Sequence, residues 1–170
     1  MGCGFCATGQ SGFERHLDTA EIVEQVVRSI WRSRPRRVSN IVFMGMGEPL
    51  ANLGAVWPAI ERIHDDIGLS ARNITVSTVG VVPGIRRLAE ASLPVNLAVS
   101  LHAANNTLRD ELVPINRQYP LETLLEACAD HVAAHNRRLS FEWALIDGVN
   151  DTDRDAEELA DLARALRAHI

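Results

Sequence analysis

The stretch NITVSTVGVVPGIRRLAEASLPVNLAVSL, residues 73–101, contains a complete strand–helix–strand repeat. Its two ends, 73–78 and 95–101, are short runs of β-branched and other apolar residues, which predicts two buried strands. Between them the turn VGVVPG leads into a helix through IRRLAEA. Two strands joined by a helix are parallel when they lie in one sheet, with a right-handed crossover. The stretch therefore predicts a parallel α/β fold.

The same alternation continues on both sides of this repeat. A buried strand is expected at 38–44 and another strand at 139–146, and Ile170 is expected to begin a further one. The remaining expected helices cover residues 17–31, 56–66, 106–113, 121–135 and 153–168. Such a run of βα units predicts either a segment of a barrel or a doubly wound sheet.

The first of these helices carries its own start signal and apolar face. Asp18 and Glu21 have the spacing of a capping box, and Pro35 is expected to end the helix. One apolar stripe is predicted along it, formed by Ile22, Val23, Val26, Val27 and Ile30.

Composition restricts the classes of protein that fit. The chain of 170 residues has the length of one domain, and 46% hydrophobic with 23% charged residues is typical of a globular protein. It contains no apolar run long enough to span a membrane and no signal peptide, so we expect a cytoplasmic protein. A net charge of −5 argues against binding nucleic acid over the whole surface. The basic cluster at 32–37 could contact phosphate, but a solvated helix end is the favoured interpretation.

Polar residues and glycine follow three successive predicted strands. Gly47 and Glu48 come after the first, Ser77 lies at the end of the second, and Ser100 and His102 end the third. Ligands bind at the carboxyl ends of the strands in barrels and open α/β sheets. Each residue alone could have a structural role, such as a hydrogen bond to the backbone or a helix cap. Their recurrence at one edge of the sheet favours a binding site.

The two cysteines near the start, Cys3 and Cys6 in GCGFCATG, leave three kinds of chemistry open. A redox pair would follow a strand directly, and none is predicted here. A structural zinc site needs four ligands, whereas Cys128 has the helical spacing of a core residue. An iron–sulfur cluster is the third possibility, since its cysteines come at short spacings within a loop.

A set of motifs in fixed order resembles the RlmN/Cfr family of radical-SAM RNA adenine methyltransferases. The set comprises GCGFCATGQSGFERHL, NIVFMGMGEPLAN, ITVSTVGVVPGIRRLA, LAVSLHAANNTLRDELVPINRQYP and FEWALIDGVND. The resemblance runs through the whole chain. It implies that residues 1–170 are a radical-SAM core domain with the fold of a partial (β/α)6 TIM-like barrel, truncated at both ends.

The resemblance also assigns cofactor residues. The family's cluster motif is C-x-x-x-C-x-Φ-C, with Φ aromatic, and Cys3, Phe5 and Cys6 match its second half. Cys3 and Cys6 would then be ligands of a 4Fe–4S cluster, and the first cysteine would lie two positions before Met1. The residues implied to bind S-adenosylmethionine (SAM) are Gly47, Glu48, Ser77, Ser100, Leu101 and His102.

The implied reaction uses one SAM to methylate a cysteine and a second SAM to generate a radical, which transfers the methyl group to an adenine carbon. The implied partners are 23S rRNA, tRNA and a flavodoxin-type electron donor. The resemblance also implies that the enzyme is a monomer and does not bind a membrane. No residue in the chain matches the family's proton acceptor or its methyl-carrying cysteine, so no catalytic residue is assigned. We therefore expect an N-terminal domain and a C-terminal segment outside this chain. Residues 1–170 by themselves are expected to be inactive.

Three functions remain open on the sequence. Methylation of adenine C2, as in RlmN, is favoured because Gln10 and Phe13 fit that pattern better. Methylation of C8, as in Cfr, and a SAM- or metal-binding module without turnover are the alternatives. The sequence also leaves the roles of four polar residues undecided, namely Arg109, Asn116, Glu142 and Asn150.

Overall fold

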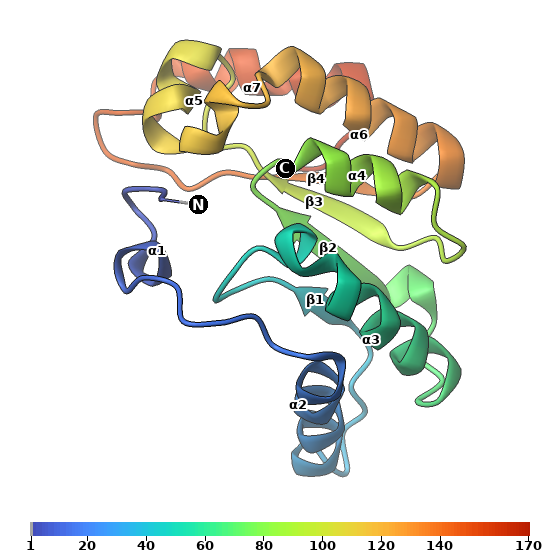
Figure 1. The fold of residues 1–170 in the computed structure, drawn as a ribbon. Coiled ribbons are helices and arrows are strands. Elements are labelled where there is room, and N and C mark those ends of the chain that lie inside the picture. The colour runs from blue at the N-terminus through green and yellow to red at the C-terminus, as the bar shows by residue number, and fades with distance from the viewer. Residues whose placement is uncertain (1) are drawn as a thin grey trace.

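Four parallel strands form a single sheet in the computed structural model, which describes residues 2–170 (Figure 1). The strands are β1 (Ile41–Phe43), β2 (Ile74–Thr78), β3 (Asn96–Ser100) and β4 (Leu139–Glu142). Their order in the sheet is β1-β2-β3-β4, the order in which they occur along the chain. A doubly wound sheet would reverse direction at its centre, so the sequential order is that of a barrel segment. Of the two expected architectures, the partial barrel is confirmed.

Helices alternate with the strands, as the sequence predicts. The α-helices are α1 (Ala7–Gln10), α2 (Thr19–Arg32), α3 (Leu53–Asp65), α4 (Val82–Ala89), α5 (Asn106–Leu112), α6 (Leu121–His135) and α7 (Asp153–Leu166). Three short 3-10 helices precede or follow them: η1 (Pro49–Asn52), η2 (Ala71–Asn73) and η3 (Pro114–Arg117). Helices α3, α4 and α6 cover one face of the sheet, and α1 lies apart from them, beyond the carboxyl ends of the strands (Figure 1). No helix among residues 2–170 is long and apolar enough to cross a membrane.

The two faces of the sheet differ in chemistry. On β2 the side chains of Ile74 and Val76 belong to the hydrophobic core beneath the helices, and Val99 of β3 joins them. The alternate residues point to the opposite face, where Ser77 pairs in register with Ala98 and Ser100 pairs with Glu142. Small and polar residues on that face leave room for a ligand inside a barrel.

Two strands differ from their predicted form. Strand β1 contains three residues instead of the seven in 38–44, and Val42 is half exposed, so the prediction of a fully buried strand is wrong there. The reason is that β1 is an edge strand with β2 as its only partner in the sheet. Strand β4 ends at Glu142 instead of residue 146, because the next backbone groups leave the ladder: Ala144 N–H donates to His102 Nδ1 at 3.0 Å.

The last residues begin a further parallel pairing beside β4. His169 forms a parallel bridge with Ser140, and Phe141 N–H donates to the carbonyl of His169 at 2.7 Å. The expected extra strand at the end of the chain therefore starts one residue earlier than predicted.

Helix α2 starts as predicted, but its apolar stripe is less buried than the sequence predicts. Asp18 Oδ1 accepts from Glu21 N–H and Glu21 Oε2 accepts from Asp18 N–H, both at 2.9 Å, which is the complete capping box. None of its residues is fully buried, and Val27 of the predicted stripe is half exposed. The basic cluster at 32–37 follows at its exposed end.

Candidate functional site

The loop after β1 is tied to the end of β2 through Glu48. Its carboxylate accepts from Val79 N–H at 2.9 Å and from Leu50 N–H at 3.0 Å. Burial raises the pKa of Glu48, although the two backbone donors oppose that shift. Gly47 beside it has a φ of 148°, which disfavours any residue with a Cβ. The GMGEP loop thus presents a carboxylate at the carboxyl edge of the sheet.

Arg109, on the short helix α5, ties the ends of β2 and β3 together and is completely buried. Its Nε donates to the Leu101 carbonyl at 3.1 Å, and one terminal nitrogen donates to the carbonyls of Val79 at 2.8 Å and Ser100 at 3.4 Å. The other terminal nitrogen donates to Asn116 Oδ1 at 2.8 Å. A single guanidinium therefore fixes the backbone at the ends of two neighbouring strands.

His102 is held in one orientation and one tautomer. It adopts a left-handed φ of 59°, and Asn150 Nδ2 donates to its carbonyl at 2.8 Å. Because Nδ1 accepts from Ala144 N–H, the ring proton is on Nε2, which leaves a donor facing away from β4. Burial, and then the charge of Arg109, lower the pKa of His102 to about 4, so the ring is neutral near pH 7.

The cysteine loop lies against this edge. The ring of Phe5 meets the ring of His102 edge to face, with centroids 4.8 Å apart. Cys6 N–H donates to the Cys3 carbonyl at 3.1 Å, and Gln10 Nε2 donates to the carbonyl of Gly4 at 2.8 Å, which closes the loop. The cysteine loop thus contacts a residue nearly a hundred positions later in the sequence, at the carboxyl edge of the sheet.

Both thiols of this loop are free, with Cys3 buried and Cys6 half-buried. Burial first, and then the neighbouring Cys6 thiol, raise the pKa of Cys3, while Arg109 acts in the opposite direction. Cys128 is instead enclosed in α6 within the core, where burial raises its pKa to about 12. Its expected role as a core residue is confirmed.

The predicted site residues divide into two groups. Glu48, Ser77, Ser100 and His102 all lie at the carboxyl ends of the first three strands. Leu101 differs, because its side chain is fully buried in the core and its N–H and carbonyl bond to Glu142 and Arg109.

The four residues whose roles the sequence left undecided also separate. Asn116 and Asn150 are almost completely buried, and their amides connect loops to one another. Glu142 is exposed on the polar face of the sheet, in register with Ser100. The buried position of Arg109 had no signal in the sequence, because α5 is too short to show an apolar face.

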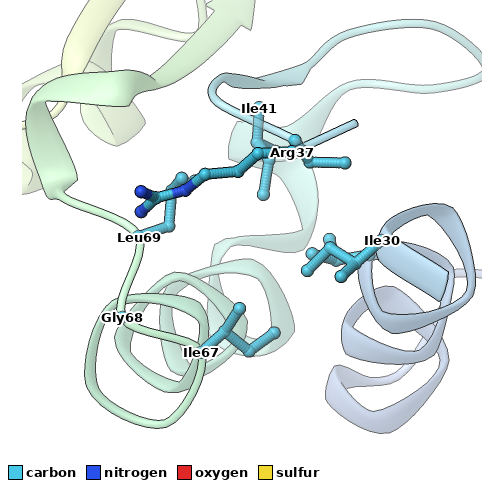
Figure 2. A pocket seen from close by; sticks show the side chains of 8 residues that line it. Ile30, Arg37, Ile41, Ile67, Gly68 and Leu69 are labelled. Atoms are coloured by element: carbon cyan, nitrogen blue, oxygen red, sulfur yellow. The ribbon is translucent and has the colours of Figure 1, made fainter. Parts of the chain in front are cut away.

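A small apolar pocket lies elsewhere, between α2 and the segment before β2 (Figure 2). Arg37 is the one charged side chain in its lining, which otherwise consists of Val26, Ile30, Val38, Ile41, Ile67, Gly68 and Leu69. Of the lining residues outside α2, Ile41 begins β1 and the others lie just before β1 or β2, so the pocket is at the amino edge. It is separate from the polar groups at the carboxyl edge.

The sequence profile of the Radical SAM superfamily matches residues 1–163 of the chain. The chain belongs to the radical SAM superfamily. Membership implies a 4Fe–4S cluster and SAM as cofactors. Within residues 2–170 no three candidate ligands gather in one place, so the residues present supply two thiolates, from Cys3 and Cys6. Two soft thiolates at a short spacing on one loop fit an iron–sulfur cluster.

Relatives and solved structures agree with this assignment. A "Probable dual-specificity RNA methyltransferase RlmN" from Gloeobacter violaceus is 54% identical over 170 residues, which are 100% of this chain and 49% of the relative. A "Dual-specificity RNA methyltransferase RlmN" from Syntrophobacter fumaroxidans is 52% identical over 100% of this chain and 50% of its own length. The chain spans about half the length of the curated relatives it matches.

A crystal structure of a radical SAM methyltransferase from Sphaerobacter thermophilus superposes with a TM-score of 0.95 at 50% identity, covering 99% of this chain and 50% of that one. Streptococcus suis SuiB bound to S-adenosylmethionine superposes with a TM-score of 0.65 at 15% identity, covering 98% of this chain and 34% of that one. The second likeness shows the radical SAM fold alone.

Proposed function

We propose that residues 1–170 are the radical SAM core of an RNA methyltransferase that modifies adenine C2 in 23S rRNA and tRNA through a methyl-cysteine intermediate. Relatives named RlmN that cover all of this chain support the proposal, as do the ordered motifs. Because those relatives are about twice as long, we place an N-terminal domain and the methyl-carrying cysteine in segments outside these residues.

The contact between Phe5 and His102 carries this proposal, because it brings the cysteine loop onto the carboxyl edge. In the proposed arrangement Cys3 and Cys6 hold the cluster together with a third cysteine outside the chain. Residues that end or follow three different strands would then surround SAM beside it, namely Gly47, Glu48, Ser77, Ser100, Leu101 and His102.

Each of these residues has a role that its geometry supports. The Glu48 carboxylate, held by two backbone donors, would accept from the ammonium group of SAM. The neutral His102 ring keeps Nε2–H as a fixed donor. Leu101 would act through the backbone it shares with Arg109, since its side chain belongs to the core.

The reason for a radical mechanism is chemical. An adenine ring carbon of the amidine type is not nucleophilic, so polar methyl transfer is unavailable to it. A cluster held in part by Cys3 and Cys6 would, when bound and reduced, supply the one electron that reductive cleavage of SAM requires. We propose a flavodoxin-type protein as the one-electron donor, and a monomeric enzyme acting in the cytoplasm, where ribosomes and tRNA are found.

Mass spectrometry of nucleosides tests the proposal. The full-length enzyme, reconstituted anaerobically and given RNA, SAM and a reductant, should produce 2-methyladenosine, whereas residues 1–170 alone should produce no methyladenosine. The product 8-methyladenosine would instead support the Cfr-type alternative, and SAM binding with no methylated product would support a module without turnover.

The variant Glu48→Gln should weaken SAM binding by roughly 10-fold to 100-fold, because it removes one charge-assisted contact. Glu90→Gln provides the matched control, since Glu90 is exposed at the end of α4, away from the carboxyl edge. Equal affinity in the two variants would contradict the assignment of Glu48.

A further inference from the structure

Arg109 is a buried cation whose hydrogen bonds all end on neutral oxygens. Its partners are the carbonyls of Val79, Ser100 and Leu101 and the side-chain oxygen of Asn116. It forms no salt bridge with any carboxylate among residues 2–170. Burial lowers its pKa to about 10, which still leaves the guanidinium charged at neutral pH.

A buried charge without an ionic partner is costly, even when its donors are satisfied. Asp110 is the nearest source of negative charge on the same helix, but it is half-buried and accepts from Asn116 Nδ2 at 2.6 Å. If Arg109 only tied strand ends together, neutral donors would do so at lower cost. The position therefore indicates that an anion completes the surroundings of the guanidinium.

The guanidinium lies at the strand ends against which the cysteine loop packs. The Leu101 carbonyl that accepts from Arg109 precedes His102, on whose ring Phe5 of the cysteine loop rests. Gly80 makes room for the guanidinium, since a Cβ there would lie 3.3 Å from its terminal nitrogen.

We propose that Arg109 is a positioning residue whose buried positive charge is matched by the anionic iron–sulfur cluster of Cys3 and Cys6, and that it thereby raises the reduction potential of that cluster. Thiolate ligands give such a cluster net negative charge, and one-electron reduction adds another negative charge. A fixed cation nearby stabilises the reduced form more than the oxidised form. The same contacts hold the strand ends around the site, so the residue has two linked effects.

The test is the midpoint potential of the cluster in the full-length enzyme, measured by redox titration followed by electron paramagnetic resonance. Arg109→Gln removes the charge and should shift the potential to a more negative value, whereas Arg109→Lys should stay near the wild type. Asp110→Asn removes a neighbouring negative charge and should shift the potential to a more positive value. Arg138→Gln, at an exposed arginine before β4, is the control and should leave it unchanged.

Two results would overturn the inference. The first is an equal midpoint potential in the wild type, Arg109→Gln and Asp110→Asn, which would show that Arg109 only holds the strand ends together. The second applies if Arg109→Gln does not fold: an unchanged midpoint potential in Asp110→Asn would then reject the inference that nearby charge sets the potential. The inference rests on the cluster site of the proposed function. A wild-type enzyme without a cluster would overturn both, whereas a normal cluster with unchanged potentials overturns this inference alone.

Discussion

At the scale of single residues, Gly80 shows how little space remains beneath the carboxyl edge. Its φ is 110°, and an added Cβ would lie 3.2 Å from Leu124 Cδ2 and 3.3 Å from the Arg109 guanidinium. Gly80→Ala should therefore reduce the free energy of unfolding by about 1–3 kcal/mol, through backbone strain and crowding together. Urea denaturation followed by circular dichroism would measure the change.

Gly54 offers a matched control for this substitution. It is exposed in α3, and an added Cβ there would meet nothing within 4 Å. Gly54→Ala should leave stability unchanged or raise it by about 0.5–1 kcal/mol, because alanine favours the helix. A destabilisation of equal size in the two variants would show that Gly80 has no special role.

At the scale of secondary-structure elements, helix α6 is joined to its neighbours by two histidines. His131 Nε2 lies 3.3 Å from the carbonyl of Val95, the residue before β3, and His135 Nε2 lies 2.9 Å from the Leu88 carbonyl on α4. His131 is fully buried, and its Nδ1 has no partner among the described residues. Burial first, and then the nearby His135, lower the pKa of His131 to about 4.

This pKa predicts a loss of stability in mild acid. Above pH 6.5 the His131 ring is neutral in both the folded and the unfolded chain. Between pH 6.5 and about 4 the unfolded chain binds a proton that the folded chain does not, so the free energy of unfolding falls as the pH falls. The loss from His131 should reach at most about 3 kcal/mol.

Denaturation curves at several pH values would measure this effect. The variant His131→Leu should show a smaller decrease in stability over that pH range, with His102 contributing the remainder because its pKa is also about 4. An identical decrease in the wild type and in His131→Leu would show that protonation of His131 does not control acid stability.

The elements also show which features the sequence could predict. The βαβ pattern located every strand and long helix, because periodicity and turn residues are local signals. The length of β1 and β4 was missed, since an edge position and the capture of Ala144 N–H by His102 depend on distant parts of the chain. The inward position of Arg109 was missed for the same reason, because its partners lie just after β2, on β3 and on η3.

At the scale of the whole molecule, the sheet divides the domain into two ends with different properties. The carboxyl edge gathers Glu48, His102 and the cysteine loop, whereas the apolar pocket of Figure 2 and the basic cluster lie toward the amino edge. Helices cover one face of the sheet (Figure 1), and small or polar residues such as Ser77, Ala98 and Ser100 occupy the other. This arrangement concentrates charged and soft groups where the strands end, which is where a cofactor can meet several of them.

The most direct test of the central claim, that the cysteine loop and the carboxyl edge form one cofactor site, is the visible absorption spectrum of the full-length enzyme after anaerobic reconstitution with iron and sulfide. Cys3→Ala and Cys6→Ala should each lose the broad absorption of a 4Fe–4S cluster, because each removes a thiolate ligand. Cys128→Ala should keep the full spectrum, since that thiol is enclosed in the core. A cluster that survives Cys3→Ala and Cys6→Ala but is lost in Cys128→Ala would contradict the account.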